Sequence, residues 1–307
     1  MNSGKNFAVV YRQLIQDLLF TGKEVEAIRG RKTKEILNYS ICIENPASNL
    51  VYIKGRKFSI MHAIQESLGL VIANNSVEFA SLFNERMKDF SDDGKTLYGC
   101  YGRRISGYLG NVRDKLAMDK NTRSAVLSIY KIADVAVVTK DIPCTETIQF
   151  LIRDNKLNMI VNMRSNDCIW GTPYDIFMFT NLQMVMANSL GIEVGKYYHN
   201  VGSMHLYSDM EETAYSMLDN LFVDIEKRNR NTLFEWTMLA TSLSSFVRYK
   251  ERDGISLSLI VDMMEDDSYG MAILKELEYR EMIPKCVDDE KLKKELWLAP
   301  FTKRWKL

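Results

Sequence analysis

Four short segments of this sequence place polar or nucleophilic residues among apolar neighbours, where they could do chemistry. In the first, Cys144 follows Pro143 at the start of an apolar stretch, so its thiol is either a nucleophile or a small core residue. In the second, Arg164 and Ser165 end an apolar strand. An arginine with a serine hydroxyl can hold a phosphate dianion in a fixed geometry, and the alternative is a solvated turn.

The third and fourth segments add groups that could contact a sugar or a base. His205 and Tyr207 are two residues apart, so strand alternation places them on one face. There they either bind a sugar hydroxyl or are hydrogen-bonded core residues. Asp175 stands at a predicted helix start, where a carboxylate commonly caps free backbone amides. His62 and His199 have no such neighbours, and we interpret both as structural or exposed.

A hairpin and a helix must position most of these residues. Apolar and polar residues alternate from 147 to 164 around the turn Asp154-Asn155-Lys156. This pattern predicts a β-hairpin with one buried face and Arg164 on the other face. Pro173 then opens a predicted helix with an apolar inner face, and Gly191 is placed to end it.

The flanking segments predict the remaining architecture. Helical spacing of apolar residues predicts helices over 7–28 and 60–73, with Glu66 on the second, and residues 36–41 are typical of a strand. From about residue 209 the sequence changes to helix-like segments that are charged on one side. These segments are 209–228, 231–249, 256–265 and 269–283. We therefore expect an α+β body over residues 1–215 and a helical C-terminal extension over residues 216–307.

Composition excludes several classes of function. The 307 residues include 40 Lys and Arg against 40 Asp and Glu, so a net charge of zero gives no general attraction to nucleic acid or to an anionic membrane. No apolar run approaches the roughly 18–20 residues that span a bilayer. The 5 cysteines are scattered without a CxxC pair, which disfavours a disulfide framework or a zinc site. We expect a cytoplasmic protein without a metal, a direct nucleic-acid partner or a membrane partner.

Taken in chain order, these motifs resemble the thymidylate synthase family. Pro143-Cys144 with Gln149-Phe150 resembles the family's active-site strand, and Arg164-Ser165-x-Asp167 resembles its phosphate segment. The other matching positions are Glu66, Tyr98-Gly99, Arg123, Gly171-x-Pro173-Tyr174 and Gly202-x-x-His205-x-Tyr207. Several motifs in order, over roughly residues 25–210, are far more specific than any one of them. The resemblance implies the family's β-sheet body with flanking helices.

The resemblance also implies a transferase mechanism. In the family a cysteine thiolate adds to carbon 6 of a pyrimidine nucleotide, and carbon 5 then takes a one-carbon unit from 5,10-methylenetetrahydrofolate. By this resemblance Cys144 is the nucleophile and Glu66 the acid/base group, with Tyr98 and Asp175 as further catalytic residues. The residues implied for substrate binding are Arg29, Arg123, Arg164 and Ser165 at the 5′-phosphate, His205 and Tyr207 at the 3′-hydroxyl, and Asp167 near the ring and the folate. Asn166 is expected among the substrate-binding residues as well. The family's arginine at the position of Arg123 comes from the partner subunit, which implies a homodimer with a shared phosphate site.

Departures from the family pattern concern the base. Asp175 stands where thymidylate synthases carry an asparagine. A carboxylate can accept a hydrogen bond from the amino group of cytosine, whereas uracil presents it with a carbonyl oxygen, and such a buried mismatch costs about 1–3 kcal/mol. Thr145, Asn166 and Ser203 also depart from the usual residues, and this set resembles the deoxycytidylate 5-hydroxymethylases of phages. Ser124 replaces one of the usual paired arginines, and the family's C-terminal lid has no visible counterpart.

These observations predict that the chain converts deoxycytidylate (dCMP) to 5-hydroxymethyl-dCMP with methylenetetrahydrofolate and water. Within the fold, the alternatives are a methylase of dCMP or deoxyuridylate (dUMP) and a CMP hydroxymethylase, the latter disfavoured by Ser165. An alternative of a different class is a non-catalytic nucleotide-binding subunit of a replication complex, which the helical extension would suit. The intact set of Glu66, Cys144 and Arg164 argues against that alternative, because binding alone does not require it.

Overall fold

The computed structural model divides the chain into two compact units, Met1–Leu233 and Phe234–Leu307. It describes residues 1–26, 31–53, 56, 58–81, 84–220 and 222–225, all in the first unit. Arg29 and the helices expected beyond residue 231 lie outside the described residues. The domain boundary expected near residue 215 therefore stays a prediction.

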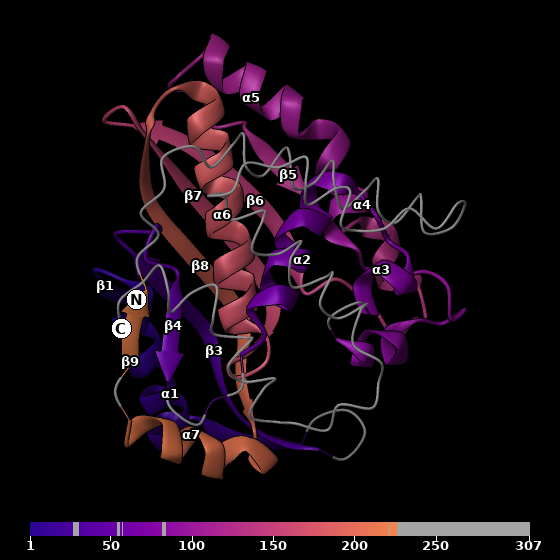
Figure 1. Cartoon of the computed structure of the whole chain (residues 1–307), viewed down its shortest axis with the longest axis vertical. Coiled ribbons are helices and arrows are strands. Elements are labelled where there is room, and N and C mark those ends of the chain that lie inside the picture. Colours follow the sequence, from indigo (N-terminus) through magenta and orange to yellow (C-terminus); the bar gives the residue numbers. More distant parts are fainter. Residues whose placement is uncertain (27–30, 54–55, 57, 82–83, 221, 226–307) are drawn as a thin grey trace, which may run out of the picture. The chain divides into compact units, whose positions relative to one another are not determined.

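A mixed sheet of seven strands forms the centre of the first unit (Figure 1). Its strand order is β1-β3-β8-β7-β6-β5, with β2 also pairing with β3. The strands are β1 (Asn2–Gly4), β2 (Lys23–Glu26), β3 (Lys32–Ile43), β5 (Val126–Ser128), β6 (Thr145–Arg153), β7 (Lys156–Asp167) and β8 (Glu193–Tyr207). A second, two-stranded sheet pairs β4 (Leu50–Ile53) with β9 (Phe222–Ile225). The helices are α1 (Phe7–Thr21), α2 (Ile60–Ile72), α3 (Val77–Ser81), α4 (Tyr101–Ile105), α5 (Leu109–Met118), α6 (Thr172–Leu190) and α7 (Glu211–Leu218).

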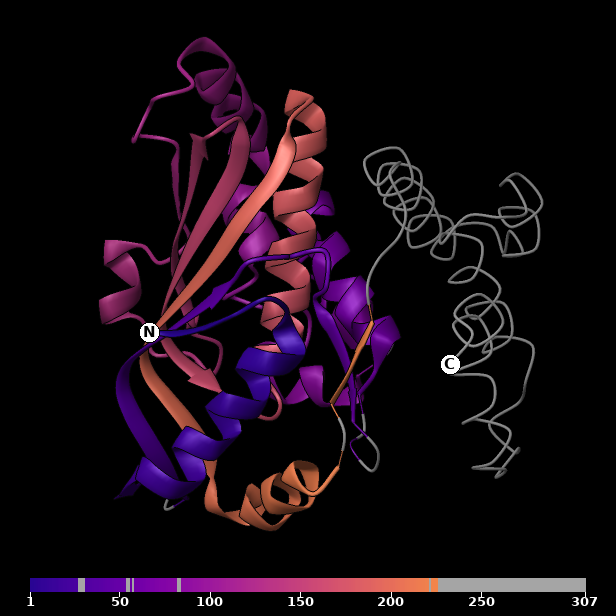
Figure 2. The same ribbon diagram turned by 90° about the vertical axis from the view of Figure 1, so that its left-hand side faces the viewer.

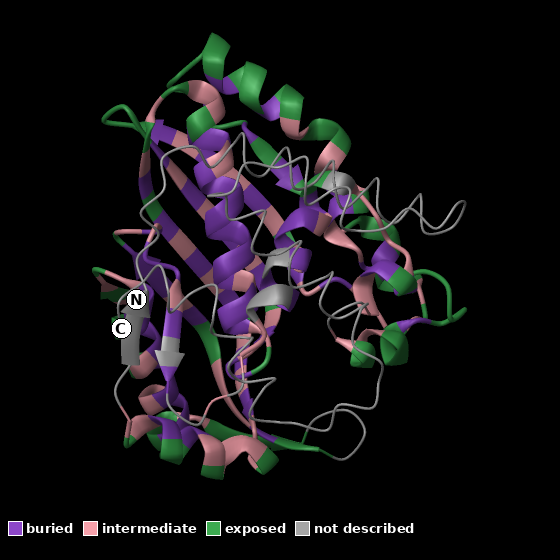
Figure 3. Ribbon diagram, in the orientation of Figure 1, coloured by how far each residue is buried: buried purple, intermediate pink, exposed green. Residues whose placement is uncertain are grey.

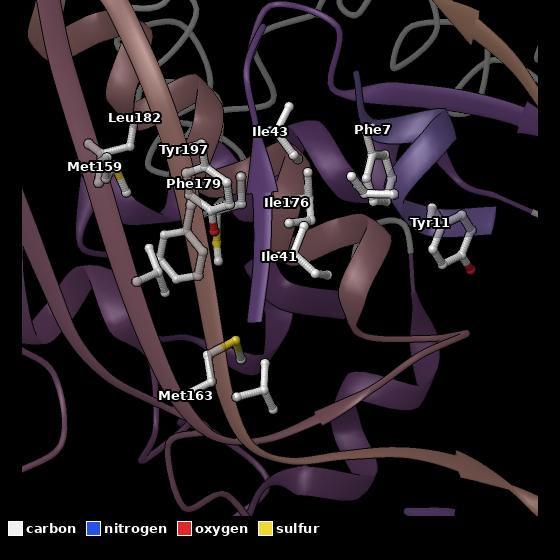
Figure 4. Packing of buried hydrophobic residues seen from close by; sticks show 14 of the residues in the cluster. Phe7, Tyr11, Ile41, Ile43, Met159, Met163, Ile176, Phe179, Leu182 and Tyr197 are labelled. Atoms are coloured by element: carbon white, nitrogen blue, oxygen red, sulfur yellow. The ribbon is translucent and has the colours of Figure 1, made fainter. Parts of the chain in front are cut away.

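Helices α1 and α6 cover one face of the large sheet (Figure 2). Tyr197 on β8 and Ile43 on β3 are directly paired and therefore point to the same side, and both are fully buried. Figure 4 shows Ile176 and Phe179 of α6 packed in the same cluster as these strand residues. The expectation of an α+β body with a β-sheet and flanking helices is confirmed.

The predicted hairpin and its following helix are confirmed. Strands β6 and β7 pair antiparallel around Asp154 and Asn155, whose φ angles of 52° and 55° are those of a tight hairpin turn. Buried and half-buried positions alternate along both strands (Figure 3). The helix expected after Pro173 is α6, and it ends at Gly191, where φ is 66°.

Two helix predictions were too long. The helix expected over 7–28 ends at Thr21, and β2 follows it. Residues 23–26 form a strand because they pair with β3. Opposite charges face each other across the two strands, in the pairs Lys23–Glu35, Glu24–Lys34 and Glu26–Lys32. The helix expected over 209–228 is present as α7, but Phe222–Ile225 is strand β9 because its backbone pairs with β4.

The regular alternation of side chains is interrupted at one level of three neighbouring strands, β3, β8 and β7, and we call this interruption the bend. It lies just before the strand ends that carry the predicted site residues. On β7 the buried positions change from odd to even numbers between Met163 and Asn166, and β8 makes the same change between Val201 and Met204. On β3, Asn38 lies between two paired residues with a φ of 53°. An irregularity of this kind re-aims the side chains that follow it. Here those side chains are the polar residues at the ends of β7 and β8.

Candidate active site

The predicted nucleophile lies beside the predicted phosphate arginine. Cys144 directly precedes β6, and Arg164 donates from Nη2 to its Sγ at 3.8 Å. The same guanidinium donates to the carbonyl oxygens of Pro143 at 2.9 Å and Ile142 at 3.0 Å, which fixes its position against the segment that carries the cysteine. Burial raises the pKa of the Cys144 thiol to about 11, and the Arg164 charge opposes that shift. The thiol is therefore protonated at neutral pH and must lose its proton to react.

Other predicted site residues lie next to one another at the ends of the neighbouring strands β7 and β8. Asp167 on β7 pairs with His205 on the parallel strand β8, and its Oδ1 accepts from the amides of Ile169 at 2.6 Å and Trp170 at 2.8 Å. The rings of His205 and Tyr207 are 5.1 Å apart, which confirms that they share a face. The His205 Nδ1 atom is buried and has no hydrogen-bond partner within the described part of the chain. A buried ring nitrogen of this kind is suited to a ligand hydroxyl.

Asp175 lies in the first turn of α6 but does not cap it. Gly171 is the N-cap residue, and the Asp175 carboxylate instead accepts a hydrogen bond on Oδ2 from Asn166 Nδ2 at 2.7 Å. Burial raises the pKa of Asp175 to about 8, and the charges of Glu66 and Asp167 add to this effect. The group is therefore mostly a neutral carboxylic acid at neutral pH, which can donate a hydrogen bond as well as accept one.

A buried polar chain extends from Asp175 into the core. Asn166 Oδ1 receives the Thr172 hydroxyl at 2.7 Å and contacts His199 Nε2 at 3.1 Å. The other ring nitrogen of His199 lies 2.8 Å from the hydroxyl of Tyr197. Because burial lowers the pKa of His199 to about 3, its ring is neutral. His199 is thus a buried, hydrogen-bonded residue, as interpreted from the sequence, but its contact with Asn166 was not anticipated.

Glu66 approaches the same region from α2. Its Oε1 lies 3.5 Å from Nε2 of the buried His62, which also contacts Asn84 Nδ2 at 3.2 Å. The charge of Glu66 is one of the causes that raise the pKa of Asp175.

Two residues implied by the resemblance lie in other surroundings. The Tyr98 hydroxyl donates to Asp134 at 2.7 Å, and Arg104 donates to the same carboxylate at 2.6 Å. Arg123 is exposed, and its carbonyl oxygen accepts from Gln149. The roles of Tyr98 and Arg123 stay predictions.

Several contacts at the site were missed from the sequence. Arg31 lies over the Tyr207 ring at 3.7 Å and pairs with Asp209 at 2.8 Å. Thr172 and Tyr197 complete the polar chain. A histidine on the apolar face of β8 was the available signal, because a buried imidazole needs hydrogen-bond partners. Among the described residues, no cluster of three or more His, Cys, Asp or Glu side chains is arranged to hold a metal.

Comparison with known proteins shows a consistent set of relatives. The model of the thymidylate synthase family matches residues 9–260. The deoxyuridylate hydroxymethyltransferase of Bacillus phage SP01 is 32% identical over 225 residues, which are 67% of this chain and 58% of that protein. The deoxyuridylate hydroxymethyltransferase of Delftia phage PhiW-14 is 30% identical over 213 residues, which are 64% of this chain and 59% of that protein. The chain thus spans little more than half the length of these relatives.

A solved structure supports the fold. The thermostable thymidylate synthase A from Bacillus subtilis matches with a TM-score of 0.60 and 19% sequence identity, over 71% of this chain and 86% of that one. At this identity the match concerns the architecture alone.

Proposed function

The chain belongs to the thymidylate synthase family, and we propose that it hydroxymethylates carbon 5 of a pyrimidine deoxynucleotide monophosphate, with dCMP as the first choice of substrate. The observation that carries the reaction class is the contact of Arg164 with Cys144, because it joins an anion-binding group to a nucleophile. The phage relatives are hydroxymethyltransferases by name, which supports water rather than hydride as the group that completes the reaction.

In the proposed reaction the Cys144 thiol loses its proton and its sulfur bonds to carbon 6 of the ring, which makes carbon 5 nucleophilic. Arg164 and Ser165 hold the 5′-phosphate, together with Arg29 and with Arg123 of a second copy. His205 and Tyr207 hold the 3′-hydroxyl. After carbon 5 has gained the one-carbon unit and lost its proton, the bond from that unit to the folate nitrogen would break, so that tetrahydrofolate leaves and a methylene group stays double-bonded to carbon 5. Glu66 accepts a proton from the water that adds to this methylene carbon. The bond from sulfur to carbon 6 then breaks.

Asp175 would read the base. As a neutral acid it can donate a proton to nitrogen 3 of cytosine and accept from the amino group on carbon 4. Donation to nitrogen 3 also neutralises the charge that develops as sulfur adds to carbon 6. The corresponding test is Asp175→Asn, which we expect to shift preference from dCMP towards dUMP. Unchanged discrimination in this variant would remove the argument for cytosine.

Trp170 and Asp167 are the residues that we propose for the folate. Trp170 is 44% exposed and offers an aromatic face, and Asp167 has its Oδ2 free of any described hydrogen bond. A flat pteridine with N–H donors fits an aromatic face next to a carboxylate acceptor. Methylenetetrahydrofolate would supply the one-carbon unit. Trp170 and Asp167 would orient it and exclude water from its ring.

A second candidate is hydroxymethylation of dUMP. Two observations favour it: the names of the phage relatives, and the raised pKa of Asp175. A neutral carboxylic acid can accept from nitrogen 3 of uracil and donate to the carbonyl oxygen on carbon 4, so burial of Asp175 weakens a simple exclusion of uracil.

For the assembled protein we propose a homodimer in the cytoplasm. No described helix combines the length and the apolar character that a membrane crossing needs. Arg123 is exposed, which supports its use by a neighbouring copy.

The deciding experiment measures tritium release from carbon-5-labelled dCMP and dUMP in the presence of methylenetetrahydrofolate, with mass spectrometry of the product. We expect release from dCMP and the gain of a hydroxymethyl group. A methyl product would contradict water trapping, and release from dUMP alone would favour the second candidate. Release from neither nucleotide, or a Cys144→Ser variant that keeps all biological activity without releasing tritium, would contradict an enzymatic role and favour a nucleotide-binding subunit. Full tritium release by Cys144→Ser would contradict Cys144 as the nucleophile.

A further inference from the structure

We propose that Asn166 fixes which oxygen of the Asp175 carboxyl group carries the proton, and so decides between cytosine and uracil. Asn166 is then a specificity-determining positioning residue, and this inference rests on the proposed function. Asp175 alone would not discriminate between the two bases. A freely rotating carboxylic acid can present its donor and its acceptor in either order, so by itself it accepts both bases.

Two side chains besides Asp175 contact the Asn166 amide and hold its oxygen. The Thr172 hydroxyl donates to Asn166 Oδ1 at 2.7 Å, and His199 Nε2 lies 3.1 Å from the same oxygen. Because Asn166 turns its NH₂ group to Asp175, its oxygen faces His199, so the neutral ring carries its hydrogen on Nε2 and accepts from the Tyr197 hydroxyl, 2.8 Å away, on Nδ1. A flipped amide would need the other tautomer of His199 and would turn its oxygen to Asp175, so it could no longer donate to Asp175 Oδ2.

The locked amide makes the two oxygens of Asp175 unequal. Its Nδ2 donates to Oδ2 at 2.7 Å, and an oxygen that already accepts a hydrogen bond there is the carbonyl oxygen of the acid. The proton is thereby confined to Oδ1. The charged neighbours that act on this carboxyl group, Glu66 and Asp167, are both acidic and favour the neutral acid. The other titratable groups in electrostatic contact with it, Cys144, Tyr101 and Tyr197, are neutral because burial raises the pKa of each.

Packing prevents the pair from rearranging. Asn166 is only 4% exposed. A Cβ atom at Gly171 would lie 2.8 Å from Asn166 Nδ2, so the missing side chain at the start of α6 leaves the space that the amide occupies. The bend in β7 turns Asn166 to the buried face, whereas its neighbours Ser165 and Asp167 are only half-buried.

The fixed order of donor and acceptor suits one base. Cytosine needs a donor at nitrogen 3 and an acceptor at carbon 4, and uracil needs the reverse. With Oδ1–H at nitrogen 3 and Oδ2 at carbon 4, dCMP satisfies both oxygens, while dUMP meets donor against donor and acceptor against acceptor. A buried polar mismatch of this kind corresponds to at least about tenfold in affinity.

The test is Asn166→Asp in the full-length protein, with dCMP and dUMP binding measured by titration calorimetry and tritium release measured in parallel. The introduced carboxylate keeps the acceptor for Thr172 and His199 but takes the Asp175 proton on the Oδ2 side. We expect the preference for dCMP over dUMP to fall by at least about tenfold, or to invert. The matched control is Asn162→Asp, the same change on the same strand at a residue bonded to Thr147 and Asn200, and it should keep the wild-type preference.

A second pair of variants, at Thr172, tests the same inference if Asn166→Asp does not fold. Thr172→Val removes one of the two donors that lock the amide, and we expect a smaller loss of preference, which Thr172→Ser restores. A purely structural role would weaken both nucleotides equally and leave their ratio unchanged, and that result overturns the inference. Wild-type protein that binds neither nucleotide would overturn the proposed function as well, so the two failures are distinct.

Discussion

At the scale of single residues, the site keeps its two most reactive groups protonated by burying them. Burial raises the pKa of Cys144 to about 11 and that of Asp175 to about 8. The consequences differ, because a protonated thiol is inactive whereas a protonated acid can donate to a base. Arg164, whose charge lowers the pKa of Cys144, would therefore act on the proposed nucleophile as well as on the phosphate.

The raised pKa of Asp175 predicts a pH-dependent cost in stability. Between the unfolded pKa near 4 and the folded pKa of about 8, the native protein binds a proton that the unfolded chain has released. The free energy of unfolding therefore falls as pH rises through this window. We expect Asp175→Asn to raise the Tm by a few degrees at about pH 8 and by much less at about pH 5, measured by calorimetry. An equal effect at both pH values would contradict the assignment.

The Cys144 thiol should react with iodoacetamide faster as pH rises towards its pKa. Arg164→Gln removes a positive charge that lowers this pKa, so we expect alkylation at about pH 8 to slow several-fold. Arg164→Lys keeps a positive charge and should react at a rate between the two. Mass spectrometry of the Cys144 peptide gives the rates, and Cys144→Ser identifies the background. Equal rates in all three proteins would show that Arg164 does not act on the thiol.

At the scale of elements, the helix that carries Glu66 is placed by contact with a short helix. In α4, a Cβ atom at Gly102 would lie 1.8 Å from the carbonyl oxygen of Gly69 in α2. Glycine at position 102 therefore lets the two backbones touch, and a larger residue must push them apart. The position of Glu66 depends on this contact, although the two glycines are not part of the site.

We expect Gly102→Ala to lower the Tm by several degrees, from about 1–3 kcal/mol of overpacking, and to reduce turnover by displacing Glu66. Gly110→Ala is the matched control. Gly110 lies in α5, and a Cβ atom added there would meet nothing within 4 Å, so the same substitution should leave turnover unchanged. Thermal unfolding and the tritium-release rate test both variants. An unchanged Tm for Gly102→Ala would contradict the close contact.

The sequence predicts elements whose pattern is local and misses those that depend on a partner strand. The β6–β7 hairpin follows from alternation around Asp154-Asn155, and α6 follows from Pro173 and Gly191. Strand β2 depends on charges in β3, and the bend depends on the register of three strands at once. The resemblance assigned Cys144 and Arg164 to one site but did not predict their contact. The hydrogen-bonded residues next to Asp175, from Asn166 to Tyr197, depend on tertiary packing that single-sequence patterns do not contain.

At the scale of the whole molecule, the implied use of Arg123 by a second copy makes catalysis a property of the dimer. Cys144→Ser and Arg123→Glu should each be inactive alone. In a mixture that exchanges subunits, half the dimers are mixed, and one of their two sites has both an intact cysteine and an intact arginine. We expect about a quarter of wild-type activity in the mixture, measured by tritium release. No recovery after confirmed subunit exchange would mean that Arg123 does not act across subunits.

Strands β7 and β8 are parallel neighbours joined through α6, so Arg164, Asn166, Asp175, His199 and His205 all belong to one uninterrupted stretch of chain. This arrangement has a consequence for inheritance. A recombination event whose two breakpoints flank residues 164–207 transfers the proposed base-reading residues together, whereas a breakpoint inside this stretch would separate residues that are proposed to act together. Chimaeric genes made from relatives with different base preferences should therefore take the preference of whichever parent supplied this stretch, and crossovers within it should be selected against.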